Sequence, residues 1–553
     1  MTATALVERR QETDEPRETG SRSRRGGWRT VSRSAVATVL GWTLVLVLWE
    51  WVAEVPLGGT HLIAPPSEIV VDIVENAALY SRALLTTGQS ALTGYLIGNI
   101  AAVLLAVLVA ILPWSERVVL RVSLIVYCLP LIALGPLLRL LFGLGSGPQT
   151  TLAAIAVFYL TLVPLLVGLR AVPSAWTELV TSYGRGRFTT LVVVRVRACL
   201  PYLVSGLQVS VPAAFLGALV GEFTGAESGI GVLSIRALRS LDTAGVWALA
   251  SISTAVSVLV YALVGWVGRK FTTDQPPVLL ATATRGADLR PRWRRAAGAA
   301  GEGIGIAALV VVLWVVFLWG FHLNPYFAKG PVEVWEWLVT AADAAANRSE
   351  IFDALTATAV VAVPGYVVGV ALGVVAAIVF DLVPSARRVM TPAAVALRCV
   401  PIIAVAPLLV QLLGRGPLAT TAIVALTTFF PTLVACMTGL RLAPGQVVDV
   451  FDTFATPRWR TLLLARVPAM VPAFFSAARV AAPSAILAAT VAEWLATGTG
   501  VGNLMAVSAA TSRYSALWAT TVLLLVFSVF AYWIIELVER RVLRAVAPEQ
   551  STW

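Results

Sequence analysis

The sequence predicts an all-α membrane protein of about 12 transmembrane helices, arranged as two parallel six-helix repeats. Three observations lead to this fold class. Of the 553 residues, 58% are hydrophobic and only 13% are charged, whereas about 25% are charged in an average soluble protein. Apolar runs close to the roughly 20 residues that cross a bilayer recur along the chain. The second half of the chain also matches the first. Together these features exclude a soluble domain, a disordered chain and a secreted disulfide scaffold.

The repeat is defined by one constant offset of 271 positions. The matched residues include Gly94 with Gly365, Glu222 with Glu493 and Trp247 with Trp518. A shared apolar bias would not align glycine, glutamate and tryptophan together. The chain is therefore one unit written twice.

Each half contains six apolar runs, which we take as helices. In the first half they fall near 35–53, 86–112, 118–142, 149–169, 201–222 and 243–267. In the second half they fall near 304–321, 356–381, 389–413, 420–440, 472–493 and 515–537. An even number of spans gives both halves the same orientation, so the repeat is parallel and not inverted. Two polar stretches that begin with proline, 65–80 and 331–344, are predicted to be short external helices at the membrane interface.

The basic residues predict the topology. The arginine-rich tail, the joining segment and the C-terminal Arg540, Arg541 and Arg544 are cytoplasmic by the positive-inside rule, while the outer loop 54–84 has one basic residue, Arg82. The net charge of +11 is thus explained without nucleic acid, because no basic recognition helix appears. We expect a multi-pass protein of the cell (inner) membrane with both termini inside. Its predicted parts are a disordered tail 1–34, a first repeat 35–268, a linker 269–302, a second repeat 303–545 and a tail 546–553.

Two predicted cytoplasmic segments, 170–200 and 441–471, join the fourth and fifth helices of each half. Each contains an acidic residue, a turn six residues later and a basic-aromatic patch. These residues are Glu178, Gly184, Arg187 and Phe188 in the first half, and Asp449, Ala455, Arg458 and Trp459 in the second. We expect two short helices joined at the turn, with a patch suited to a protein surface. Pro201 and Pro472 are expected at the start of the next helix.

These segments resemble the EAA loop of permeases in binding-protein-dependent ABC importers. That motif reads Glu-Ala-Ala, three residues, Gly, nine residues and Ile-x-Leu-Pro. Glu178 and Gly184 match it in the first half; in the second, Asp449 stands for the glutamate, Ala455 for the glycine, and Pro468 keeps the proline. Neither copy is complete. The runs PLLRLLFGLGSGP and PLLVQLLGRGP, and GEFTGAESGIGVL and AEWLATGTGVGNL, resemble the sulfonate/nitrate/taurine branch.

The resemblance covers about 60–270 and 325–540 and implies a fused, two-copy permease with the type I importer fold. It implies two copies of a cytoplasmic ATPase that receives the coupling segments, with ATP and Mg²⁺ on that partner. It also implies an external binding protein that delivers a small solute, of sulfonate, nitrate, taurine or pyrimidine type. One fused chain would form each transporter.

The chain itself is not expected to be an enzyme. A phosphate-binding P-loop needs G-x-x-x-x-G-K-[ST], and neither of the two lysines, Lys270 and Lys329, lies in such a motif. The four cysteines lack CxxC spacing and the two histidines fall in separate loops, so no metal or cofactor site is predicted.

Several residues are candidates for the solute pathway. Glu222 and Glu493 each end a long apolar run and are read either as gate residues near the outer mouth or as markers of the membrane boundary. Prolines inside the third and fifth helices would kink them beside a pathway, or are tolerated there by packing. These prolines are Pro130, Pro212, Pro401 and Pro483.

Two other functions compete with the importer. An ion-coupled secondary transporter with two parallel six-helix halves would place charged residues along its pathway. The membrane core of this sequence is almost uncharged, and the paired cytoplasmic segments favour the importer. Those segments also weaken a third hypothesis, a membrane scaffold without transport.

Overall fold

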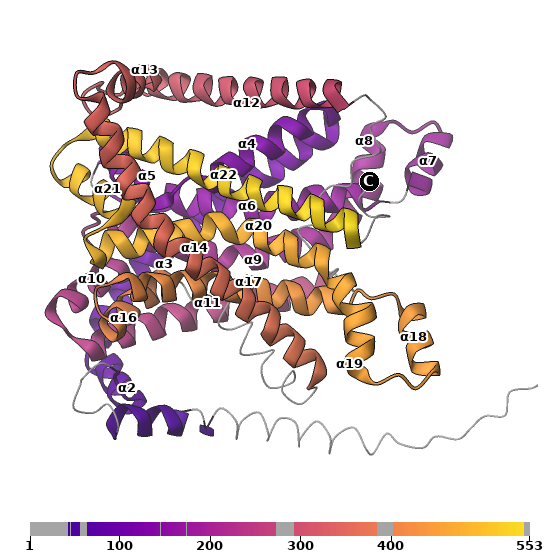
Figure 1. The fold of residues 1–553 in the computed structure, drawn as a ribbon, viewed down its shortest axis with the longest axis horizontal. Helices are drawn as coiled ribbons and strands as arrows, with labels where there is room; N and C mark the ends of the chain where they lie inside the picture. The colour runs from indigo at the N-terminus through magenta and orange to yellow at the C-terminus, as the bar shows by residue number, and fades with distance from the viewer. Residues whose placement is uncertain are drawn as a thin grey trace, which may run out of the picture.

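The computed structural model describes residues 43–44, 46–55, 63–143, 145–172, 174–271, 292–383 and 402–546. All regular elements in these ranges are helices (Figure 1). Nine of the helices are long and apolar enough to span a membrane, or ten if one bent pair counts as a single span. The all-α membrane fold is confirmed. The predicted runs 35–53 and 389–413 lie partly outside the described residues, and so do the linker and the tail 546–553. The tail 1–34 lies wholly outside them.

Within the described residues, the first repeat begins with a helical stretch at 46–54. Its helices are α2 (Pro66–Glu75), α3 (Ala77–Ile111), the 3-10 turn η1 (Pro113–Ser115), α4 (Glu116–Cys128), α5 (Leu131–Phe142), α6 (Gly147–Arg170), α7 (Ser174–Ser182), α8 (Arg187–Thr190), the π-helical η2 (Leu191–Arg195), α9 (Val196–Phe223), α10 (Ile230–Ser240) and α11 (Thr243–Phe271).

The second repeat has the same order. Its helices are α12 (Arg292–Gly320), α13 (Pro331–Trp335), the π-helical η3 (Glu336–Thr340), α14 (Ala344–Leu382), α16 (Ile402–Leu413), α17 (Pro417–Leu440), α18 (Gly445–Thr453), α19 (Arg458–Thr461), η4 (Leu462–Arg466), α20 (Val467–Ala492), η5 (Glu493–Thr497), α21 (Gly500–Ala510) and α22 (Tyr514–Val546). The bounds of α5 and α16 differ by the offset of 271 found in the sequence. Helix α12 begins within the predicted linker.

The third helix of the first repeat is broken, although the sequence predicts one span at 118–142. α4 and α5 meet at 90°, because Leu129 between them is extended, with φ −63° and ψ 127°. Proline disfavours the helical conformation in the residue before it and lacks the N–H that would continue the ladder. Pro130 therefore ends one helix and begins another.

The expected positions of two further prolines were wrong. Pro201 and Pro472 lie inside α9 and α20 and do not begin them. Both helices begin before the proline and continue directly from the π-helical segments η2 and η4. A membrane helix tolerates such a proline because neighbouring groups satisfy the freed carbonyl.

The bundle has two distinct ends. The short helices α7, α8, α18 and α19 lie at one end, where α12 begins and α22 finishes, whereas α10, α13 and α21 lie at the other (Figure 1). By the predicted topology these are the cytoplasmic and external ends. Short helices are present in the stretches 65–80 and 331–344, as α2 and as α13 with η3; their external position stays a prediction.

Within each repeat the second helix packs tightly on the fourth. A Cβ atom on Gly94 of α3 would lie 2.5 Å from Ala153 of α6, and one on Gly365 of α14 would lie 2.7 Å from Val424 of α17. Residues without a side chain let helix backbones approach closely, which is a main source of helix association in membranes. The matched glycines therefore have a packing role.

The two repeats interlock through their third helices. α5 contacts α20, α21 and α22, and α16 contacts α9, α10 and α11. Gln411 of α16 donates from Nε2 to Thr243 Oγ1 at 2.6 Å. Leu131 and Leu137 share one buried cluster with Ile486 and Met505. One cluster of the core therefore runs across both halves.

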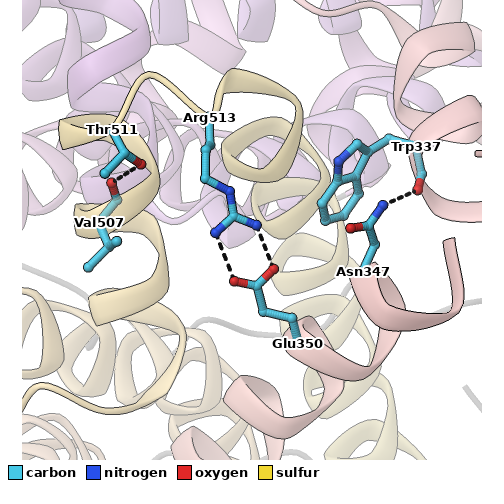
Figure 2. Close-up of polar contacts among 6 residues, drawn as sticks. All are labelled: Trp337, Asn347, Glu350, Val507, Thr511 and Arg513. Atoms are coloured by element: carbon cyan, nitrogen blue, oxygen red, sulfur yellow. Dashed lines mark hydrogen bonds and ion pairs between the residues drawn. The ribbon is translucent and has the colours of Figure 1, made fainter. Parts of the chain in front are cut away.

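The external end of the second repeat is fastened by polar contacts (Figure 2). Arg513, in the turn before α22, makes two hydrogen bonds with Glu350 of α14, at 3.0 and 2.7 Å. These hydrogen bonds raise the pKa of Arg513 above its usual value. Asn347 Nδ2 donates to the carbonyl of Trp337 at 3.0 Å. The start of α14 is therefore tied to both η3 and α22.

Candidate functional site

Two matched hairpins of short helices form the candidate site. α7 with α8, and α18 with α19, project from the predicted cytoplasmic end of the bundle (Figure 1). This is the arrangement predicted from the sequence, two short helices joined at a turn. Each hairpin continues through a π-helical segment into a membrane helix, α9 or α20. A displacement of the hairpin would therefore be transmitted to that helix.

The turn has the same hydrogen bonds in both repeats. Arg185 N donates to Val180 O at 3.3 Å, and Thr456 N donates to Phe451 O at 3.0 Å. These are the bonds of a Schellman C-cap, whose penultimate residue adopts the left-handed conformation. Gly184 does so with φ +68°, and Ala455 does so with φ +49°. The second repeat keeps this geometry with a residue that is strained there.

Each hairpin exposes an apolar face that sequence reasoning missed. The side chains are Trp176, Leu179 and Tyr183 in the first repeat and Val447, Val450 and Phe454 in the second; their exposed fractions run from 42% to 79%. The three positions in each hairpin are separated by three and four residues, the spacing of one helix face. They also match at the offset of 271. Apolar residues at this spacing, repeated at the offset of 271 in segments predicted to be cytoplasmic, were the sequence signal that could have found them.

The residues predicted from the sequence lie on the same two hairpins. Glu178 and Asp449 are exposed on α7 and α18, and Arg458 and Trp459 are exposed at the start of α19. The guanidinium of Arg460 lies 5.1 Å from the centre of the Trp459 ring. The backbone of Arg187 and Phe188 begins α8, and their side chains lie outside the described part of the structure.

The hairpins differ in how they are held. In the second repeat Arg466 of η4 makes an ion pair with Asp381 at the end of α14, 2.8 Å apart. In the first repeat Arg195 takes the place of Arg466, but Ala110 takes that of Asp381. Arg195 Nε is buried without a hydrogen bond among the described residues. Among the described residues, only the second hairpin is therefore fixed to its second membrane helix by charge.

Glu222 is buried at the external end of α9 and is 2% exposed. Its Oε1 accepts a hydrogen bond from Thr87 of α3 at 2.6 Å, and its Oε2 accepts one from the N–H of Gly231 at 2.6 Å. Thr87 Oγ1 in turn accepts from the N–H of Ile230 at 2.9 Å. The carboxylate and the hydroxyl satisfy the first N–H groups of α10, which otherwise have no partner in the helix.

Glu493 makes the same arrangement in the second repeat. It is 3% exposed, and its Oε2 accepts from both Thr358 and Gly502 at 2.9 Å. Val501 N donates to Thr358 Oγ1 at 2.9 Å. We call each set a glutamate clamp. It fastens the short helix, α10 or α21, to the ends of the second and fifth membrane helices. Neither predicted reading, a gate residue or a marker of the membrane boundary, included this structural role. A gating role stays a prediction.

The candidate pathway prolines are dispersed. Pro130 lies at the break between α4 and α5. Pro212 and Pro483 lie within α9 and α20, which run on through them. Pro401 lies outside the described residues. The structure brings Pro483 near the other repeat, because its neighbour Ser484 is 2.9 Å from the hydroxyl of Tyr127.

Comparison with known proteins gives the same duplication. The family model described as "Binding-protein-dependent transport system inner membrane component" matches residues 98–273 and again 369–544. The two matches are separated by 271 positions and together cover more than half of the chain. Each begins in the second membrane helix of a repeat and ends near its last.

Individual relatives correspond to about one repeat. A probable ABC transporter permease protein of Haemophilus influenzae is 26% identical over 41% of this chain and 93% of its own length. The formylaminopyrimidine transport permease protein of Halalkalibacterium halodurans is 28% identical, over 42% and 93%. A putative aliphatic sulfonates transport permease protein of Escherichia coli is 24% identical, over 40% and 82%.

Proposed function

Because this chain belongs to the family of inner-membrane components of binding-protein-dependent transport systems, we propose that it forms the complete translocation pathway of an ABC importer. Both permease units are supplied by one chain. Two copies of a separate ATPase would bind at the cytoplasmic end, and an external binding protein would deliver the solute. ATP would be hydrolysed on the partner and not on this chain.

The observation that supports this proposal best is the duplicated apolar face on the hairpins. Large apolar side chains exposed at a polar end of a membrane protein are costly in water and are typical of a surface that a partner covers. The two faces match in position, which fits a partner present twice. The hairpins also continue into α9 and α20, so a bound ATPase could move these helices.

The class of solute is inferred here from the relatives alone. Two of the three relatives named above have a solute in their names, a formylaminopyrimidine permease and a putative aliphatic sulfonates permease. We propose a small polar solute of this general range. The choice of solute in such a system also depends on the binding protein, which is another chain.

The first experiment is affinity purification of the chain from its native membrane in mild detergent, with quantitative mass spectrometry of the proteins that co-elute. We expect a P-loop ATPase at two copies per chain and a solute-binding protein. A well-folded preparation without an ATPase would contradict the proposal and favour an ion-coupled transporter. One ATPase copy per chain would restrict coupling to one hairpin.

Substitutions then test the apolar faces. Leu179→Arg and Val450→Arg should each weaken ATPase binding by about tenfold or more, because a central apolar contact commonly contributes over 1.4 kcal/mol. The double variant should abolish transport while the purified chain keeps its elution profile. Thr181→Arg, two residues from Leu179 and so on the opposite side of α7, is the matched control and should bind normally. Equal effects of Leu179→Arg and Thr181→Arg would reject the face as the contact.

A further inference from the structure

A buried pair of opposite charges joins α20 and α22 in the second repeat, near the predicted cytoplasmic end of α22. Arg479 of α20 and Glu539 of α22 approach to 2.9 Å between Nε and Oε2, and their side chains are only 7% and 6% exposed. Ionisable groups inside a membrane protein are costly and commonly mark a substrate or ion pathway. The almost uncharged core expected from the sequence therefore has an exception.

The charges are in contact but are not well hydrogen-bonded. Neither Arg479 Nε nor Glu539 Oε2 has a hydrogen bond among the described residues, so the N–H does not point at the oxygen. A bidentate arginine–carboxylate pair, with two parallel hydrogen bonds, would be stronger. The guanidinium is thus held in place by charge while its capacity for directed hydrogen bonds to an oxyanion is not used by Glu539.

The pair lies where the two repeats meet. Tyr127 of α4, in the first repeat, donates its hydroxyl to the carbonyl of Val480 at 3.1 Å, one residue from Arg479. The Tyr127 ring stacks on Tyr159 of α6 at 4.5 Å. The guanidinium of Arg479 lies 5.8 Å from the centre of the Tyr532 ring. We call Tyr127, Tyr159, Arg479, Tyr532 and Glu539 the junction cluster.

The cluster also adjoins the broken helix. Tyr127 is the penultimate residue of α4, just before the 90° break at Leu129 and Pro130. In secondary transporters built from repeats, substrate sites lie at the interface between the repeats and use discontinuous helices. The junction cluster has both features.

The first repeat has no such charges. The positions of Arg479 and Glu539 are occupied by Gln208 and Gly268, while Tyr261 matches Tyr532. Gln208 Nε2 donates to the carbonyl of Tyr261 at 3.3 Å. The first repeat adopts the same fold with this neutral arrangement, so the fold does not require the ion pair.

We propose that Arg479 binds the anionic group of the translocated solute, a small sulfonate or carboxylate, and that Glu539 neutralises the guanidinium when no solute is bound. A guanidinium offers five N–H donors in a planar fork that fits either oxyanion. The tyrosine rings would line the rest of the site. The chain then has one anion site, contributed mainly by the second repeat. This inference rests on the proposed function, because it assumes that the interface between the repeats is a pathway.

The test is equilibrium binding to the full chain in lipid nanodiscs, without ATP, by saturation-transfer NMR. The probes are methanesulfonate and acetate, with dimethyl sulfone as the neutral analogue. We expect saturable binding of at least one anion and none of the sulfone. The anion that binds more tightly identifies the class of solute. Absence of saturable binding of both anions would overturn the proposal.

Two variants are expected to change the affinity for the anion in opposite directions. Arg479→Gln, which copies the first repeat, should weaken anion binding at least tenfold. Glu539→Gln should tighten it severalfold, because the carboxylate no longer competes for the guanidinium. A purely structural ion pair would give the reverse or no effect on binding. If Arg479→Gln does not fold, Arg479→Lys keeps the charge without the planar fork and should bind measurably but more weakly.

The matched control is Arg513→Gln, which breaks the external ion pair with Glu350 and should leave anion binding unchanged. Glu539→Gln binding no tighter than the wild type would overturn the proposal. Because anion binding is measured without the ATPase, failure of the anion site can be distinguished from failure of the proposed function. Loss of ATPase binding in the chain as isolated would reject the proposed function, whereas loss of the anion site alone would leave that function standing.

Discussion

Ala455 and Gly184 show how one residue can differ while its backbone does not. Both residues close a Schellman turn with positive φ, and the turn at Gly184 was predicted from the sequence because glycine permits it. At Ala455 only the repeat indicated a turn. The left-handed conformation costs an L-residue about 1–2 kcal/mol. The second hairpin is therefore formed at a local energetic cost that the first avoids.

The prediction at this scale is a pair of opposite substitutions. Ala455→Gly should relieve about 1–2 kcal/mol of strain and lose about 0.4–1 kcal/mol to the freer unfolded chain, so α18 should be stabilised slightly. Gly184→Ala should destabilise α7 by a similar amount. Hydrogen exchange of the amides in α7 and α18 measures both effects. Slower exchange in Gly184→Ala would contradict the assignment.

At the scale of elements, the long apolar helices and the short helices of the two hairpins could be predicted, whereas the short helices α10 and α21 could not. The spans 149–169 and 420–440 agree closely with α6 and α17, because an apolar run of about 20 residues is a strong signal. α10 and α21 have only 11 residues each and depend on partners distant in sequence. Thr87 and Glu222 stand 135 positions apart, so no local pattern reveals that they fasten α10 together.

The two glutamate clamps predict unequal effects of the same substitution. Glu222 uses different oxygens for Thr87 and Gly231, so Glu222→Gln must turn its NH2 group toward one of these donors. Glu493 accepts both bonds on one oxygen, which the amide oxygen of Gln can replace. A lost buried hydrogen bond costs about 1–3 kcal/mol, so amides of α10 should exchange roughly tenfold or more faster. Those of α21 should change little in Glu493→Gln. Equal acceleration in both helices would show that the oxygens are not used as described.

At the scale of the whole molecule, the sequence predicted two parallel repeats but not their interlocking. The offset of 271 and the even number of apolar runs established the repeat. The crossing of α5 and α16 into the opposite half depends on the break at Pro130 and on contacts such as Gln411 with Thr243. A linear sequence shows neither. The same holds for the junction cluster, since Arg479 and Glu539 lie 60 positions apart on different helices.

The interlocking predicts that the halves assemble without a covalent joint. A chain divided between residues 271 and 292 and expressed as two fragments should copurify as a pair, because α5 and α16 bury surface across the junction. Each fragment alone should be recovered at low yield or aggregated. The measurement is affinity purification through a tag on one fragment. Stable, separate fragments would indicate that the cross-repeat contacts contribute little.

The ion pair between Arg466 and Asp381, present on one side only, has a mechanical consequence. A partner with two identical subunits would pull on two levers of unequal stiffness, one braced against α14 and one free of that brace. Equal forces would then displace the two hairpins unequally, because only the second one has this ion pair among the described residues. Both hairpins belong to one polypeptide, so every molecule would carry the braced and the unbraced side in the same order.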